Sequence, residues 1–276
     1  MKLISLLFIS LLLLSCGQKT EQKEQDQTVS ENLDDAIDQE MEIIDAGRGV
    51  VITNPEILSP NVYRDESGTD LSQLDDSWNE LYFDESKNKW LVDKASFKIS
   101  RDFDECAGDS VTFVLSARKA ILFFRGIETP LKEIKAVMPI VEPMLPERQF
   151  DFKFNSEEYS LSAKGKVKVY GNPYFSSQEI AGFEVEDYQD YLIDNYSLSL
   201  NKKGDRPQEI IRLPELAFIC PQLLWIGDLD QDGKPDFIFD TAEETRTYNV
   251  ELHLSSKAED DNYIIKVAEV YNSNDC

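Results

Sequence analysis

The sequence predicts a mainly β protein, with antiparallel meander or sandwich-like sheets and few short helices. Two observations lead to this prediction. From Gly49 onward, short apolar runs alternate with polar residues and are separated by turn-forming residues, a pattern typical of antiparallel strands. In this part of the chain only residues 129–138 carry good helix caps, with Thr129 as the N-cap and Pro130 in the first turn. We therefore expect strands to build the core.

Residues 1–15 have the features of a secretory signal peptide. A short positive start precedes the apolar run 3–14, which is too short to span a bilayer comfortably. The run ends in Leu13-Leu14-Ser15-Cys16, which resembles the lipobox of bacterial lipoproteins. This resemblance implies that Cys16 is acylated, for example with palmitate, and that the mature chain is anchored to a membrane of the bacterial cell envelope. The alternative is a signal peptide with a chance cysteine at its end.

Residues 16–46 form an acidic segment between the lipobox and the β-rich part. Residues 17–27 contain nothing able to build a core, which indicates a disordered tether. For residues 28–45 two interpretations remain open: continued tether, or an acidic amphipathic helix that begins with a capping box at Thr28 and Glu31. Gly17 differs from the aspartate that retains enterobacterial lipoproteins in the inner membrane, so an outer-membrane, cell-surface location is favoured.

The β-rich part divides into an N-terminal region, residues 47–145, and a C-terminal β domain, residues 146–276. The boundary is placed near residue 145 because Pro139, Pro143 and Pro146 interrupt both helix and strand. Strands are expected in the first region at residues 50–52, 80–83, 89–92, 96–100, 110–117 and 120–124, and in the second at residues 150–154, 159–163, 166–170, 196–200, 208–213, 223–226, 237–239, 250–254 and 263–268.

One stretch carries a recognisable pattern of ligand spacing. Residues 224–240 contain aspartates at positions 1, 3, 5 and 9 of a loop and a glycine, Gly233, at position 6. Calcium binds six to eight oxygens at roughly 2.3 to 2.6 Å, and alternate residues of a tight loop can point at one ion. An EF-hand is excluded because position 12 is Phe239 instead of glutamate, and because the loop runs into a strand pattern instead of a helix.

The loop resembles instead the calcium loop of FG-GAP and related integrin-type repeats, which lies between two strands. No second copy and no repeat period are visible, so a full propeller with an ion in each blade is not expected. The alternative is a solvated turn whose carboxylates cap backbone amides. Calcium is favoured, in a structural role, because four close carboxylates repel one another without a cation. The resemblance implies as ligands the side chains of Asp228, Asp230, Asp232 and Asp236 and the backbone carbonyl of Lys234.

Asp240 is left out of this set. It lies on the same strand face as Asp236, but four strand residues span about 13 Å, too far for both to reach one ion. The segment 223–276 is also similar to the C-terminal part of certain uncharacterised secreted bacterial proteins, which have one such loop, a following Leu-x-Leu-Ser-Ser stretch (residues 252–256 here) and a terminal cysteine. That similarity implies no activity.

The cysteines left after Cys16 are Cys106, Cys220 and Cys276. An odd number in an oxidising compartment allows at most one intramolecular disulfide and three possible pairings. Cys220 with Cys276 is the preferred disulfide, because both flank the sheet expected around the loop.

The charge and the residue types exclude several classes of function. With 53 acidic and 28 basic residues and a net charge of −25, the chain repels nucleic acid and anionic lipid headgroups. The single histidine, His253, is expected to face solvent, and no nucleophile elbow or phosphate-binding loop is present. Two carboxylates suffice for a glycosidase, so carboxylate chemistry stays open. Four aromatic residues could stack on a sugar but are expected in the core: Trp78, Tyr82, Trp90 and Tyr174.

The expected function is that of a lipid-anchored, calcium-binding envelope protein, a binding or structural module without enzymatic activity. The alternative is a calcium-dependent carbohydrate-active enzyme or a glycan-binding accessory lipoprotein. No catalytic residue is assigned. The expected contacts are with the membrane through Cys16 and with a glycan or protein that the sequence does not identify.

Overall fold

The computed structural model describes residues 55–64, 71–105, 108–137, 142–169, 191–217, 219–242, 247–259 and 262–273. All of them belong to one compact unit, which spans Val50–Cys276. The expected signal peptide, Cys16 and the tether belong to the other unit, Met1–Gly49, and lie outside the described residues. No helix in the described part is long and apolar enough to cross a membrane.

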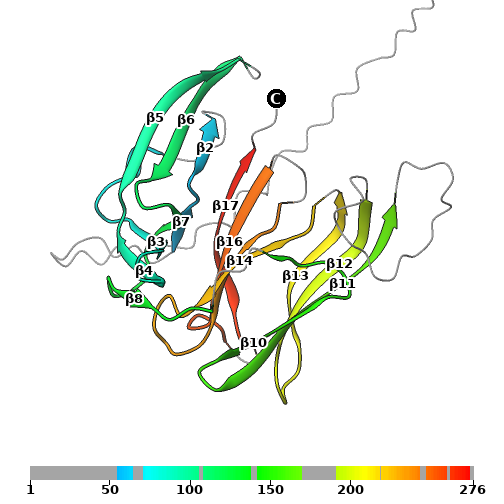
Figure 1. Ribbon diagram of the computed structural model, residues 1–276. Helices are drawn as coiled ribbons and strands as arrows, with labels where there is room; N and C mark the ends of the chain where they lie inside the picture. The colour runs from blue at the N-terminus through cyan, green and yellow to red at the C-terminus, as the bar shows by residue number, and fades with distance from the viewer. Residues whose placement is uncertain are drawn as a thin grey trace, which may run out of the picture. The chain divides into compact units, whose positions relative to one another are not determined.

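The predicted fold class is confirmed: the protein is mainly β, with four antiparallel sheets (Figure 1). The described residues contain no α-helix and one short 3₁₀ helix, Leu71–Gln73. Sheet A has the strand order β1 (Glu56–Leu58), β7 (Ala120–Arg125), β3 (Asn79–Asp84), β4 (Lys89–Lys94) and β8 (Glu133–Ile134). Sheet B contains β2 (Asn61–Arg64), β6 (Asp109–Ser116) and β5 (Phe97–Asp104).

The other two sheets come from the second half of the chain. Sheet C has the order β17 (Ile265–Ser273), β16 (Thr247–Leu254), β15 (Asp236–Asp240), β14 (Gln222–Gly227) and β9 (Glu142–Pro143). Sheet D has the order β10 (Gln149–Phe154), β11 (Glu157–Val169), β12 (Tyr191–Lys202) and β13 (Gln208–Ala217).

Sheet C is shared by two hydrophobic clusters. Successive residues of β15 point to opposite faces, and all three central side chains are fully buried. Ile238 joins the cluster built mainly from sheet A, while Phe237 and Phe239 join the cluster built mainly from sheet D. Such double burial explains why the strand reads as a continuous apolar run. The expected boundary near residue 145 lies just after β9, and the strands beyond it contribute to both clusters.

The expected helix at residues 129–138 is wrong. Its described residues, 129–137, contain no helix, and two of them form β8, which pairs with β4. The Lys132 carbonyl accepts a hydrogen bond from the Val92 N–H (2.9 Å), and the Val137 N–H donates to the Ile226 carbonyl (2.9 Å). Backbone pairing with strands of two different sheets replaces the internal hydrogen bonds of a helix, so tertiary contacts override the local capping signals.

The expected separate strands 159–163 and 166–170 are one strand, β11, in their described part. The pairing with β12 shifts between Lys164 and Lys166, so Gly165 forms a bulge instead of a turn. A Cβ at this position would lie 2.5 Å from Ile193 Cγ2, and only glycine fits without a shift of that neighbour. The remaining expected strands are confirmed, except residues 50–52, which lie outside the described residues.

The solvent-facing position expected for His253 is also wrong, because its side chain is buried, with 2% of its surface exposed. The alternation was read correctly: His253 lies on the face of β16 opposite Val250 and Leu252. That face is covered too, however, and the His253 ring packs edge-on against Phe239 at 5.4 Å. His253 Nε2 also lies 2.9 Å from the carboxylate of Glu251, in a buried hydrogen bond.

Candidate metal centre

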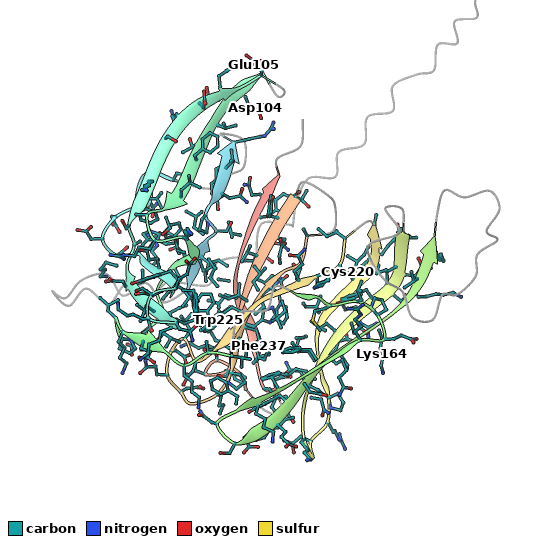
Figure 2. All side chains as sticks on the ribbon, in the orientation of Figure 1. Asp104, Glu105, Lys164, Cys220, Trp225 and Phe237 are labelled. Atoms are coloured by element: carbon teal, nitrogen blue, oxygen red, sulfur yellow. The ribbon has the colours of Figure 1, made fainter. Side chains whose placement is uncertain are left out.

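The aspartate-rich loop joins β14 to β15, and the pairing of Gly227 with Asp236 closes it. The Asp228 N–H donates to the Lys135 carbonyl (2.9 Å), so the extended segment before β9 supports the start of the loop. Gly233 has a φ of +88°, a left-handed conformation that side-chain-bearing residues adopt only with strain. Figure 2 labels Trp225 and Phe237, buried rings on the two strands that lead into and out of the loop.

Three of the four aspartates bring their carboxylates together. One oxygen from each of Asp228, Asp230 and Asp236 lies within 4.8 Å of the other two. Oxygens bound to one calcium ion lie at most about 5 Å apart, which is twice the metal–oxygen distance. Asp228 and Asp236 are buried and Asp230 is half-buried. The spacing of these three groups therefore fits a single cation of calcium's size.

Hydrogen bonds orient the two buried carboxylates. Both oxygens of Asp236 accept backbone N–H donors, Oδ2 from Leu229 (2.7 Å) and Oδ1 from Ser255 (2.8 Å). Asp228 Oδ2 accepts from the Gly233 N–H at 3.1 Å. The other oxygen, Asp228 Oδ1, is buried and has no hydrogen-bond partner. A buried carboxylate oxygen without a donor is costly, unless a cation occupies the space beside it.

Without a cation, the negative charges of the aspartates in the loop repel one another. Burial raises the pKa of Asp228, and the neighbouring carboxylates of Asp232 and Asp230 raise it further. The pKa of Asp236 lies well above its usual range, mainly because of burial and next because of Asp230. Both shifts express the free-energy cost of holding ionised carboxylates close together in a poorly solvated place. A bound divalent cation would reverse that cost.

The remaining two expected ligands are placed differently. Asp232 accepts hydrogen bonds from the Ser255 hydroxyl (3.0 and 3.1 Å) and from the Lys234 N–H (2.8 Å), and it is not one of the three converging carboxylates. Lys234 is exposed. Ligation by Asp232 and by the Lys234 carbonyl stays a prediction.

Two serines at the end of β16 contact the loop and were not assigned to the site from the sequence. The hydroxyl of Ser255 bridges Asp232 and Asp236, and the hydroxyl of Ser256 donates to Asp230 Oδ2. They belong to the Leu-x-Leu-Ser-Ser stretch that was noted as a similarity without a role. That stretch was the only available signal, because the contact joins residues 19 or more positions apart across a sheet.

Asp240 lies outside the cluster, as expected. Its Oδ1 accepts hydrogen bonds from the backbone N–H groups of Ala242 and Asn249, both at 3.1 Å, so this carboxylate caps backbone amides. Burial raises its pKa.

The other residues singled out from the sequence lie in the core or outside the described part of the chain. Trp78 and Trp90 are buried in the core, Tyr82 is half-buried against it, and Tyr174 lies outside the described residues. Cys220, labelled in Figure 2, is buried in the cluster of sheets C and D. Cys106 and Cys276 lie outside the described residues, so the Cys220–Cys276 disulfide stays a prediction.

Comparisons with protein-family models, with curated proteins and with solved structures found no match to this chain.

Proposed function

We propose that this protein is a lipid-anchored component of the bacterial cell envelope whose compact β unit binds one calcium ion in the loop 228–236 and serves as a binding or structural module without enzymatic activity. The observation that carries the calcium proposal is the unpartnered oxygen of Asp228. It is buried beside two further carboxylates at a spacing that suits one cation.

The donor set favours calcium over other metals. The converging groups are carboxylates alone, and hard oxygen donors suit calcium or magnesium better than zinc or copper. Magnesium requires near-ideal octahedral geometry at about 2.0 to 2.1 Å and usually keeps several water ligands. The loop instead offers three carboxylates to one ion, and calcium accepts six to eight oxygen ligands in variable geometry. Asp228, Asp230 and Asp236 would hold the ion.

A structural role follows from what the loop touches. The start of the loop is hydrogen-bonded to Lys135, and its aspartates accept hydrogen bonds from Ser255 and Ser256. The Gly233 carbonyl accepts a 2.6 Å hydrogen bond from the Asn155 amide. An ion in the loop would therefore hold together segments of sheets C and D and the connection that follows β8. Calcium sites in extracellular modules bind with dissociation constants of about 10⁻⁴ to 10⁻³ M, which suits an ion that stabilises a fold.

A calcium titration tests the site. The protein used is the chain from Gly17 onward, which keeps the whole compact unit. Thermal unfolding is followed in calcium-depleted buffer and then at rising calcium concentration. Stability should rise as RT ln(1 + [Ca]/Kd), by about 2.7 kcal/mol at one hundred times Kd.

The variants Asp228→Asn and Asp240→Asn form a matched pair, since both replace a carboxylate that accepts backbone N–H groups next to the loop. The first should lose the response to calcium and the second should keep it. If the unmodified chain shows no response, the aspartates form a solvated turn and the calcium proposal is wrong.

The lipid anchor is tested separately. Cells that express the full chain are labelled with a palmitate analogue, and the membrane fraction is examined. The chain should carry the label and sediment with membranes, while Cys16→Ala should do neither. Label on the Cys16→Ala chain would contradict acylation at this residue.

Glycan binding is a second candidate function, favoured by a cavity of about 440 Å³ beside the loop. Its lining includes the buried side chains of Leu200 and Ile264 and polar residues such as Asn155 and Lys202. Aromatic and apolar surface with a few polar groups is typical of small-molecule sites. A panel of oligosaccharides screened by calorimetry with and without calcium tests this candidate. Binding lost in Tyr263→Ala would support it, and no binding across the panel would reject it.

A further inference from the structure

Among the described strands, β5 forms one edge of sheet B. Its only neighbour among the described strands is β6, although it is eight residues long. Every residue from Lys98 to Phe103 is exposed, including two large apolar side chains, Ile99 (52%) and Phe103 (59%). An exposed edge strand presents a row of free backbone donors and acceptors, which is a template for pairing with another strand.

The register with β6 identifies which backbone groups point outward. The Ala117 N–H donates to the Ser96 carbonyl at 3.0 Å, in the same register that pairs Phe97 with Ser116. In an antiparallel pair, hydrogen-bonded and non-hydrogen-bonded residues alternate along the strand. The N–H and C=O groups of Phe97, Ile99, Arg101 and Phe103 therefore point away from β6, toward the outer edge of the sheet.

This constraint limits how β5 could pair with itself. An antiparallel pair must join outward-facing residues to one another, so its two-fold axis must pass through a residue and not between two residues. An axis at Lys98 or at Asp102 places two like charges directly opposite, which is destabilising. An axis at Ser100 places no like charges opposite.

The register centred on Ser100 also makes favourable pairs. Each Lys98 lies opposite Asp102 of the second copy, and each Phe97 lies opposite Phe103. Opposite-charge pairs and aromatic pairs on one sheet face each contribute to strand pairing. Because the axis is a two-fold, every such pair occurs twice.

We propose that two copies of this protein associate through β5, in an antiparallel pair centred on Ser100. The two three-stranded B sheets then form one continuous sheet, and both unpaired edges are covered. The interface is small, so association is weak, with a dissociation constant between about 1 μM and 1 mM. This inference does not depend on the calcium site.

Sedimentation velocity over a concentration series tests the association, with the chain from Gly17 onward at about 0.15 M salt, where repulsion between the two acidic copies is screened. Lys98→Asp places two acids opposite each other and should weaken dimerisation by at least about tenfold. The double variant Lys98→Asp/Asp102→Lys exchanges the charges and should restore it. Leu131→Lys, at an apolar residue that is exposed at 48% and lies outside sheet B, is the control and should have no effect.

Cross-linking tests the register. In Ser100→Cys the two new thiols face each other across a non-hydrogen-bonded pair, at a Cα separation of about 4.5 Å that a disulfide can span. In Arg101→Cys the two thiols are diagonal and about 7 to 8 Å apart, which is too far. The cysteines at 106 and 276 are replaced by serine in both.

A disulfide-linked dimer from Ser100→Cys alone supports the proposal. A monomer at every concentration overturns it. A dimer whose dissociation constant is the same in the unmodified chain, in Lys98→Asp and in the double variant overturns it as well.

Discussion

Ser255 donates two hydrogen bonds to one oxygen of Asp236, from its backbone N–H at 2.8 Å and from its hydroxyl at 3.1 Å. The same hydroxyl lies 3.0 Å from Asp232. The end of β16 thus neutralises part of the negative charge of the loop, and its hydroxyl competes with any cation for the oxygens of Asp232 and Asp236. This relationship leads to the first prediction.

Replacing Ser255 by alanine removes the hydroxyl but keeps the backbone hydrogen bond. In calcium-depleted buffer the change should lower the free energy of unfolding by about 0.5 to 1.5 kcal/mol, the usual contribution of one hydrogen bond. Urea unfolding with and without calcium measures the effect. If the ion binds here, the loss of unfolding free energy should be smaller in calcium, because the cation compensates the carboxylate charge that the hydroxyl no longer contacts. An equal loss in both buffers would mean that Ser255 and the ion are not coupled.

The pH dependence of stability and that of the gain from calcium should have opposite signs. Burial raises the pKa of Asp228 and Asp236 in the folded chain above their unfolded values, so the folded state binds protons more tightly. In calcium-depleted buffer, stability should therefore rise as the pH falls from neutral through these raised pKa values. With calcium present, protons compete with the ion, so the gain from calcium should shrink over the same range.

Urea unfolding at a series of pH values down to about 5 measures both slopes. The variant Asp228→Asn is the control, because it removes one titrating group of the cluster. It should flatten the calcium-free slope. A slope unchanged by this substitution would place the titration elsewhere.

Gly233→Ala should destabilise the loop through the backbone alone. Gly233 has a φ of +88°, and a Cβ there would meet nothing closer than the Asn155 amide nitrogen at 3.9 Å. The left-handed conformation costs an ordinary residue about 1 to 2 kcal/mol. Gly204→Ala is the matched control, since Gly204 has a φ of +95° and open space around it, in the turn after β12.

Both glycine variants should lose similar stability in calcium-depleted buffer, but only Gly233→Ala should also weaken the response to calcium. The measurement is thermal unfolding at several calcium concentrations. An equal calcium response in the two variants would mean that calcium binding does not depend on the backbone conformation at Gly233.

Alkaline unfolding should report on Tyr63. Burial raises the pKa of its phenol to about 12, and its hydroxyl donates to the Ser59 carbonyl at 2.7 Å. Because the folded chain favours the neutral phenol, the stability that this shift contributes is complete below pH 10 and is lost as the pH rises from 10 to about 12. Tyr63→Phe should reduce the slope of stability against pH in that window. An unchanged slope would assign it to other tyrosines or lysines.

Local patterns in the sequence predict most strands and the loop, and they fail where distant residues decide the structure. Alternation predicts β10 because one of its faces is exposed, and the turn-forming residues 84–88 between two apolar runs predict the β3–β4 hairpin. It cannot tell whether the second face of β16 is covered, so the burial of His253 was missed. Helix caps at residues 129–138 are real local signals, but pairing with β4 and β14 is stronger. The contact of Ser255 with Asp236 depends on sheet order, which ligand spacing alone does not contain.

The sharing of sheet C between two clusters has a consequence for how the chain folds during synthesis. Trp90 of β4 packs edge-on against Trp225 of β14, with ring centroids 6.2 Å apart. Sheet A is complete once residue 134 has emerged, yet part of its buried face has no cover until β14 to β16 follow. Contacts of such long sequence separation form slowly. The first half of the chain therefore exposes apolar surface until these later strands have been synthesised, and binding of a chaperone during that interval would protect it from aggregation.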